Sequence, residues 1–226
     1  MRAPREKRPA AKGAVEPGPA ARPGGTRERL LLEARKLLEE GGYAAASVQA
    51  IADRCGLAVG ALYRHFPSKA ELFVEVVRAT AERDIAAMKD AAASGGTVER
   101  LEAIVATFAR RALRRPRLAW ALVYEPVDPI VDVERLIYRR EHCRRMARLL
   151  RRGISSGEIP NQNVELSAAA IVGAIAESLV GPLSPIAGQI GSEEDLIASL
   201  VRFCRRSLGV ADAPALHSVK RASARR

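Results

Sequence analysis

The 226-residue sequence has few of the residues on which metal, redox and disulfide-stabilised proteins depend. Its three cysteines, Cys55, Cys143 and Cys204, are too far apart for a CxxC metal motif or a disulfide framework. It has three histidines, and GxSxG, HExxH, phosphate-loop and dinucleotide-binding glycine motifs do not occur. We therefore expect no metal, no cofactor and no enzymatic activity, and a reducing cytoplasm fits the cysteine content.

Long hydrophobic runs are also missing. The longest uncharged apolar stretch, Ala168 to Ala176, is nine residues long and ends at Glu177, whereas a membrane-spanning helix needs about 20 apolar residues. The basic N-terminus is followed by Pro, Gly and Ala and not by the apolar core of a signal peptide. We expect neither a membrane-spanning segment nor a secretion signal.

Positive charge is in excess, and much of it lies at the two ends. The chain has 37 Lys and Arg against 26 Asp and Glu, a net charge of +11, so polyanions are its natural partners. Residues 1–25 carry a net +4 and residues 212–226 a net +3. Both ends are poor in large apolar side chains, so we predict a disordered basic arm at 1–23 and a disordered basic tail at 211–226. These ends either add non-specific DNA affinity or are simply solvated.

Between the ends, apolar residues recur every three or four positions, and no segment alternates as a strand would. The sequence therefore predicts an all-α fold of about nine helices. Helix N-caps are expected at Thr26, Ser47, Ser68, Asn163 and Ser192. Helix ends are expected at Gly41–Gly42, Gly56, Pro67, Gly95–Gly96, Pro126, Ser155, Gly181–Pro182 and Gly209.

Residues 47–73 have the pattern of a helix-turn-helix. Such a motif needs a small residue where its helices cross, a turn residue that tolerates positive φ, and apolar anchors. Ala52 and Gly56 meet the first two needs, and Val48, Ile51, Leu57 and Leu62 are the anchors. The second helix of such a motif can enter the major groove of DNA. The spacing alone also fits other helical hairpins.

The residues after Gly56 are more specific. The sequence LYRHFPSK at 62–69, followed by Glu71-Leu72-Phe73, closely resembles the signature of the TetR family of bacterial regulators. The resemblance covers about residues 24–84 and includes the helix from Leu30 to Gly42. It implies a DNA-binding domain at 24–84, with its motif at 47–66, followed by a ligand-binding and dimerisation domain at 85–210.

The resemblance also implies which residues meet DNA. Helix N-termini and polar side chains would bind phosphates, and Arg64 could read a guanine with two hydrogen bonds. Ala58 and Ala61 stand where the family favours hydroxyl residues, so we expect apolar base contacts there and a contribution from DNA shape. The implied DNA-binding residues are Ser47, Gln49, Val59, Gly60, Ala61, Tyr63, Arg64, His65 and Lys69.

For the C-terminal half, the resemblance implies a dimer interface on two helices. Small residues on the eighth expected helix and an apolar stripe on the ninth would form a four-helix bundle with a second copy. The alternative is that one stripe packs inside its own monomer. The predicted interface residues are Ala169, Val172, Gly173, Ala176, Leu196, Leu200 and Phe203.

A small-molecule site is expected among the aromatic residues outside the DNA-binding part. Glu125 and Asp128 are polar candidates near its mouth, although each residue taken alone also suits a core or surface position. The predicted ligand-binding residues are Phe108, Trp120, Tyr124, Tyr138 and His142.

Seven arginines between 139 and 152 form either a solvated helix face or a site for an anionic ligand. Cys143, beside His142, and Cys204, near the expected two-fold axis, leave a redox-responsive regulator as an alternative. A non-specific DNA-coating protein is a second alternative.

The prediction is a homodimeric, sequence-specific transcriptional regulator that represses from a near-palindromic operator until an unidentified small molecule releases it. Its partners would be double-stranded DNA, a second copy of itself and that effector, with no membrane. We expect it in the bacterial cytoplasm, at the nucleoid.

Overall fold

The structure, a computed structural model, describes residues 25–186 and 191–210. This part of the chain forms nine α-helices and no strands, which confirms the all-α prediction. The predicted arm and tail at 1–23 and 211–226 lie outside it. The helices are α1 Thr26–Ala45, α2 Val48–Cys55, α3 Val59–Tyr63, α4 Lys69–Ala91, α5 Thr97–Leu113, α6 Pro116–Val123, α7 Pro129–Ser155, α8 Val164–Leu183 and α9 Glu193–Ser207.

Four of the predicted N-caps are confirmed. The side-chain oxygens of Ser47, Ser68, Asn163 and Ser192 each accept a hydrogen bond from the backbone N–H three residues later, at 3.1 to 3.3 Å. Each bond satisfies an N–H that has no partner within its own helix. The fifth prediction is wrong, because Gly25 is the N-cap of α1 and Thr26 is its first helical residue.

Glycine and proline residues shape three other helix boundaries. The regular helix of α1 is interrupted at Gly42, as predicted, because its φ of 74° and ψ of −165° are not helical; a further turn then continues α1 to Ala45. Helix α7 begins at Pro129, capped by the Asp128 carboxylate at 3.1 Å from the Ile130 N–H, because proline fits a first helical turn. Helix α8 continues through Pro182 to Leu183, since a proline in the last turn removes only one helical hydrogen bond.

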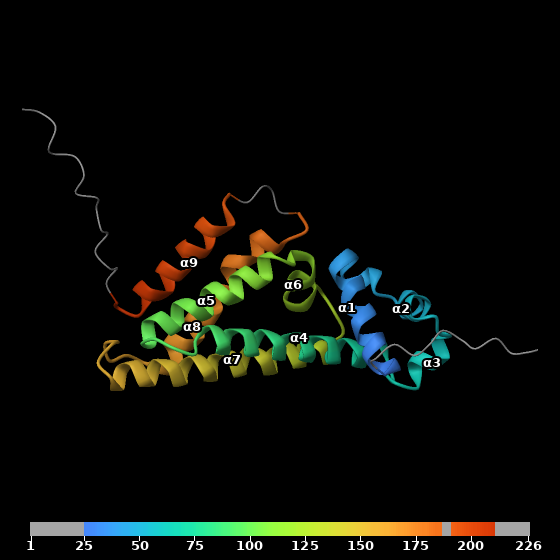
Figure 1. Ribbon diagram of the computed structural model, residues 1–226, viewed down its shortest axis with the longest axis horizontal. Helices are drawn as coiled ribbons and strands as arrows, with labels where there is room; N and C mark the ends of the chain where they lie inside the picture. Colours follow the sequence, from blue (N-terminus) through green and yellow to red (C-terminus); the bar gives the residue numbers. More distant parts are fainter. Residues whose placement is uncertain (1–24, 187–190, 211–226) are drawn as a thin grey trace, which may run out of the picture.

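The helices form an elongated molecule with α1, α2 and α3 at one end and α5, α8 and α9 at the other (Figure 1). The long helices α4 and α7 lie side by side and connect the two ends. Because α4 runs unbroken from Lys69 to Ala91, the domain boundary expected at residue 84 falls inside a helix.

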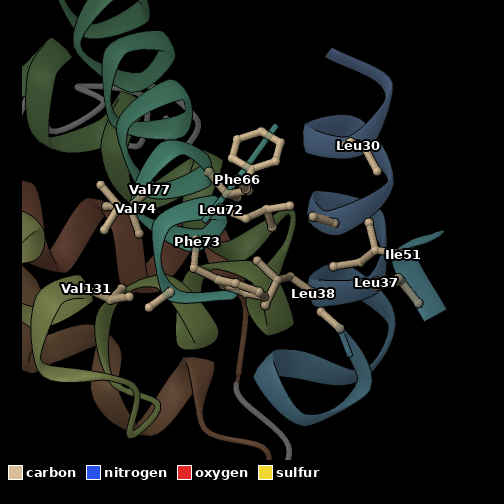
Figure 2. Close-up of a cluster of buried hydrophobic side chains, with 14 of the residues drawn as sticks. Leu30, Leu37, Leu38, Ile51, Phe66, Leu72, Phe73, Val74, Val77 and Val131 are labelled. Carbon is tan, nitrogen blue, oxygen red and sulfur yellow. The ribbon is translucent and has the colours of Figure 1, made fainter. Parts of the chain in front are cut away.

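The apolar side chains form two buried clusters. The N-terminal core joins α1, α2 and the first half of α4, and Figure 2 shows Phe73 and Leu72 of α4 pointing toward Leu38 of α1. The buried residues of the N-terminal core are Leu30, Ala34, Leu37, Leu38, Ala46, Ile51, Cys55, Leu62, Phe66, Ala70, Leu72, Phe73, Val74, Val76, Val77, Leu118, Ala121 and Val131.

The C-terminal core joins α5, α7, α8 and α9. Helix α6 belongs to both cores: Leu118 and Ala121 are buried in the N-terminal core, while Trp120 and Tyr124 pack against the C-terminal core. The buried residues of the C-terminal core are Leu101, Val105, Ala109, Leu113, Met146, Ala147, Leu150, Ile159, Ala168, Ile171, Ile175, Leu179, Leu183, Ile197, Leu200, Cys204 and Leu208.

Helix α8 bears on the expectation that the chain has no membrane-spanning segment. By length and composition it is long and apolar enough to cross a membrane, and 28% of its most apolar 18-residue window is buried inside the protein. Its buried residues all belong to the C-terminal core; they are Ala168, Ile171, Ile175, Leu179 and Leu183. A helix that packs one apolar face in a core and leaves another apolar face uncovered has the same composition as a membrane-spanning helix.

Candidate nucleic-acid interface

Helices α2 and α3 form the predicted helix-turn-helix. Gly56 ends α2 with φ 64° and ψ 36°, a left-handed conformation that residues with a side chain rarely adopt. The Leu57 N–H then donates to the Ala52 carbonyl at 2.9 Å and closes the turn. Ile51 and Leu62 are fully buried and anchor the two helices to α1 and α4.

Most predicted DNA-binding residues are available to a ligand. Leu62 holds α3 to the core, and Gly60 and Arg64 lie on the opposite side of the helix because of its 3.6-residue period. Tyr63 is 48% exposed although it is a large aromatic residue. The exposed members of the set are Ser47, Gln49, Gly60, Tyr63, Arg64 and His65, and Val59 and Ala61 are half-buried.

Two of these side chains already have partners. The Ser47 hydroxyl accepts the Ala50 N–H, which leaves its own hydrogen available to a phosphate. The Gln49 amide donates to the Asp53 carboxylate at 2.7 Å, four residues along α2. A base or phosphate contact by Gln49 would therefore have to replace this bond.

Lys69 is placed differently from the phosphate contact that was predicted. Its ammonium group donates to the Tyr43 carbonyl at 3.0 Å and lies 3.9 Å from the centre of the Tyr43 ring. Burial lowers the pKa of Lys69, while the nearby Glu125 carboxylate acts in the opposite direction. Tyr43 is 26 residues earlier in the chain, so the local motif gave no sign of this contact.

The N-terminus of α3 lacks a side-chain cap, because Ala58 occupies the capping position in extended conformation. We predict that Ala58→Ser raises the free energy of unfolding by about 1 kcal/mol, since a serine oxygen there can accept an orphan N–H. Urea denaturation measures the change. Ser47→Ala is the matched control and should lower the stability by a similar amount. An Ala58→Ser protein no more stable than the wild type would contradict the prediction.

The predicted ligand-binding residues separate into two groups. The rings of Phe108 and His142 lie 6.3 Å apart and those of Trp120 and Tyr124 lie 5.2 Å apart; Phe108, Trp120 and Tyr124 pack against the C-terminal core. Burial lowers the pKa of His142, which favours its neutral form. Tyr138 differs, because it packs against the N-terminal core.

The polar groups proposed for the mouth of the ligand site have other partners. Asp128 caps α7, and the Glu125 carboxylate accepts the Tyr43 N–H of α1 at 3.0 Å. The Tyr124 hydroxyl donates to the Ala176 carbonyl of α8. Neither Glu125 nor Asp128 thus retains the role expected from the sequence.

The arginines of α7 have the arrangement of a solvated face. All seven are exposed, Arg145 and Arg148 pair with Glu141, and Arg151 pairs with Glu165. This arrangement favours the solvated-face interpretation over an anionic-ligand site. The arginines concerned are Arg139, Arg140, Arg144, Arg145, Arg148, Arg151 and Arg152.

The cysteines are free thiols, and Cys55 and Cys204 are buried. Burial raises the pKa of Cys204 to about 11, so little reactive thiolate forms there at neutral pH. This argues against Cys204 as a redox sensor. Within residues 25–186 and 191–210, no group of three or more His, Cys, Asp or Glu side chains could hold a metal ion.

The predicted dimer residues are only partly available to a second copy. Leu200 is 4% exposed and belongs to the C-terminal core, so its prediction as an interface residue is wrong. Val172 and Leu196 are half-buried against the same core. Phe203 of α9 is 55% exposed, and so is Leu166 of α8, at 67%, which was not among the predicted residues. Among the small residues of α8, Ala169 is exposed, and Gly173 and Ala176 are half-buried.

The fold and site define a class: an all-α protein with a helix-turn-helix at one end and a separate helical core at the other. Residues 30–76 match the family described as "Bacterial regulatory proteins, tetR family". The HTH-type transcriptional repressor KstR of Mycolicibacterium smegmatis is 39% identical over 97 residues, which are 42% of this chain and 48% of KstR. The matched segment thus spans about half the length of that relative.

Solved structures resemble the chain over more of its length. A TetR/AcrR-family regulator from Thermobifida fusca matches 79% of this chain and 95% of its own, with 25% identity and a TM-score of 0.63. FadR of Bacillus subtilis, solved in complex with stearoyl-CoA, matches 78% of this chain and 96% of its own. It has 20% identity and a TM-score of 0.67. The helix-turn-helix is thus similar to that of the TetR family of bacterial regulatory proteins, and the whole described chain shares the fold of solved members of that family.

Proposed function

We propose that the protein is a homodimeric, sequence-specific transcriptional repressor that a small molecule releases from a near-palindromic operator. The observation that carries the proposal is the end of α3, where Tyr63, Arg64 and His65 are exposed between the buried anchors Leu62 and Phe66. Phenol, guanidinium and imidazole groups on a fixed helix suit phosphate and base-edge contacts. The similarity to the repressor KstR supports the same function.

The dimer is proposed because α8 and α9 expose apolar side chains at Leu166 and Phe203. A second copy related by a two-fold axis would cover both and form a four-helix bundle. The same axis would present two copies of α3 to DNA, with half-site centres about 34 to 36 Å apart or separated by further helical turns.

The effector is proposed to be a small molecule with a substantial apolar part, bound among the aromatic residues of the C-terminal core. FadR of B. subtilis, which shares this fold, was solved with stearoyl-CoA, and this supports an effector with a long apolar part. Phe108, His142, Trp120 and Tyr124 are the candidate contacts. Release from DNA requires a coupling of about 1 to 3 kcal/mol or more between the two sites. The protein would act in the cytoplasm, on nucleoid DNA.

The test is nuclease protection of the DNA upstream of the protein's own gene, with and without a panel of apolar and anionic compounds. We expect a protected near-palindrome that one compound releases. Diffuse coverage without a boundary would contradict the proposal and favour non-specific DNA coating. Protection that no compound affects would contradict the effector part alone.

Two substitutions in α3 and its C-cap should have different effects on DNA binding. Arg64→Ala should relax the preference at one base position, at a cost of about 1 to 3 kcal/mol there, whereas Tyr63→Ala should weaken binding to all sequences alike. Affinities for single-base operator variants measure both effects. Arg140→Ala, an exposed arginine on α7, is the control and should change neither. Wild-type binding by both α3 variants would contradict the interface.

A further inference from the structure

The kink of α1, residues 41–43, is held by side chains from the C-terminal half of the chain. The Arg117 guanidinium of α6 donates to the Gly41 carbonyl at 3.0 Å. The Glu125 carboxylate, in the segment after α6, accepts the Tyr43 N–H at 3.0 Å. These bonds join segments that are 76 and 82 residues apart in sequence. The two halves of the molecule thus meet at this kink as well as through α4.

Gly42 lies between these two bonds, and both its backbone conformation and its lack of a side chain permit them. It is buried and has a positive φ of 74°, which residues with a side chain rarely adopt. A Cβ atom there would lie 2.7 Å from Arg117 Nη2 and 2.7 Å from Glu125 Oε2. Both the backbone conformation and the available space therefore require glycine, so that the two side chains can reach the main chain of α1.

Glu125 is itself fixed to α7. The Arg135 guanidinium donates to the Glu125 carbonyl at 3.0 Å and to the Ala121 carbonyl at 2.7 Å. Arg135 is half-buried, so these bonds are shielded from water. Arg135 therefore ties the start of α7 to the end of α6 and to the segment that follows it. That segment in turn bonds to α1 through Glu125.

Lys69 holds the other side of the Tyr43 peptide. Its ammonium group donates to the Tyr43 carbonyl, while the Tyr43 N–H donates to Glu125. Tyr43 packs edge-on against Phe73, with ring centres 4.5 Å apart. Both polar backbone groups of Tyr43 are thus bonded by side chains from other elements, four residues before Ser47 caps α2.

We propose that Arg117, Glu125 and Lys69 form an interdomain clamp that sets the orientation of the helix-turn-helix, with Glu125 as its main positioning residue. This inference rests on the proposed DNA-binding function and assigns Lys69 to the clamp and not to a phosphate. The clamp acts without touching DNA, because it fixes the direction in which the chain leaves α1 and enters α2. Since α6 and its C-cap also carry Trp120 and Tyr124, which pack against the C-terminal core, the clamp links that core to the DNA-binding helices.

The test compares Glu125→Ala with Glu125→Gln in the full-length protein. Alanine removes the acceptor for the Tyr43 N–H, whereas the glutamine carbonyl can accept the same bond. Glu125→Ala should speed hydrogen exchange of the Tyr43 amide at least tenfold and weaken binding to the protected upstream DNA about tenfold, and Glu125→Gln should restore both. Glu193→Ala, an exposed glutamate at the start of α9, is the control.

A second variant tests the assignment of Lys69. Lys69→Met removes the ammonium group but keeps an apolar chain against Tyr43. It should weaken DNA binding while leaving the slope of log K against log salt unchanged, because no phosphate contact is lost. A slope reduced by about one unit would overturn this assignment.

Wild-type exchange of the Tyr43 amide in Glu125→Ala would overturn the clamp, and so would a Glu125→Gln variant that fails like alanine. Amide exchange does not depend on DNA. If the wild-type protein protected no DNA at all, the proposed function would fail, and the exchange of Tyr43 would still decide whether the clamp exists.

Discussion

Glutamate at both Leu166 and Phe203 should convert the proposed dimer to a monomer and weaken binding to the proposed operator by about 100-fold or more. These two side chains are the large apolar residues exposed on α8 and α9. Carboxylates there would be desolvated in a two-fold interface, and each would be present twice. The loss in DNA affinity follows because the two half-sites would no longer be bound by one linked molecule. Sedimentation and operator titration measure the two effects.

Helix α7 offers a matched control. Val133 and Ile137 are also apolar and exposed, at 56% and 54%, but they lie on a different helix. Glutamate at both should leave the proposed dimer and its operator affinity unchanged. If this pair produced the monomer and the α8–α9 pair did not, the interface would lie on α7 and the proposed four-helix bundle would be wrong.

The substitution Gly60→Leu should weaken operator binding by about 100-fold, or about 2.7 kcal/mol, without destabilising the fold. A Cβ atom at Gly60 would meet nothing within 4 Å, and the residue does not have a positive φ. The fold therefore gives no reason for a glycine there, although glycine inside a helix costs about 0.5 to 1 kcal/mol relative to alanine. Close approach of the α3 backbone to DNA in the proposed complex would supply that reason, and a large side chain would prevent it.

Gly60→Ala separates stability from binding. It should raise the free energy of unfolding by about 0.5 to 1 kcal/mol and still weaken DNA binding measurably. Gly181→Ala, at a second helical glycine with open space around it, should leave DNA binding unchanged. Wild-type operator affinity in Gly60→Leu would show that this side of α3 does not face the groove.

Local features of the sequence predicted the helix-turn-helix well. Gly56 was expected to tolerate a positive φ and has one, and the serines at 47 and 68 cap the helices that they were expected to cap. Such features depend on hydrogen bonds and backbone angles within four or five residues, so neighbouring residues in the sequence are sufficient to specify them.

Predictions about faces and long-range partners were less successful. An apolar stripe on α9 was expected at the dimer interface, but Leu200 is in the core of its own monomer. The spacing of apolar residues along a helix identifies its apolar face but not the surface against which that face packs. A core and an interface bury the same kinds of residue. Leu166 was missed because it lies outside the small-residue stripe on which the prediction relied.

The sequence alone therefore determined the helical fold, four of the helix caps, the turn at Gly56 and the TetR-type signature. Only the tertiary structure decided which residues those helices bring together. Lys69 reaches Tyr43, and Glu125 reaches the α1 kink 82 residues away. Contacts of this kind depend on how α6 packs between two cores, and packing depends on the shape of the whole chain and not on any local pattern.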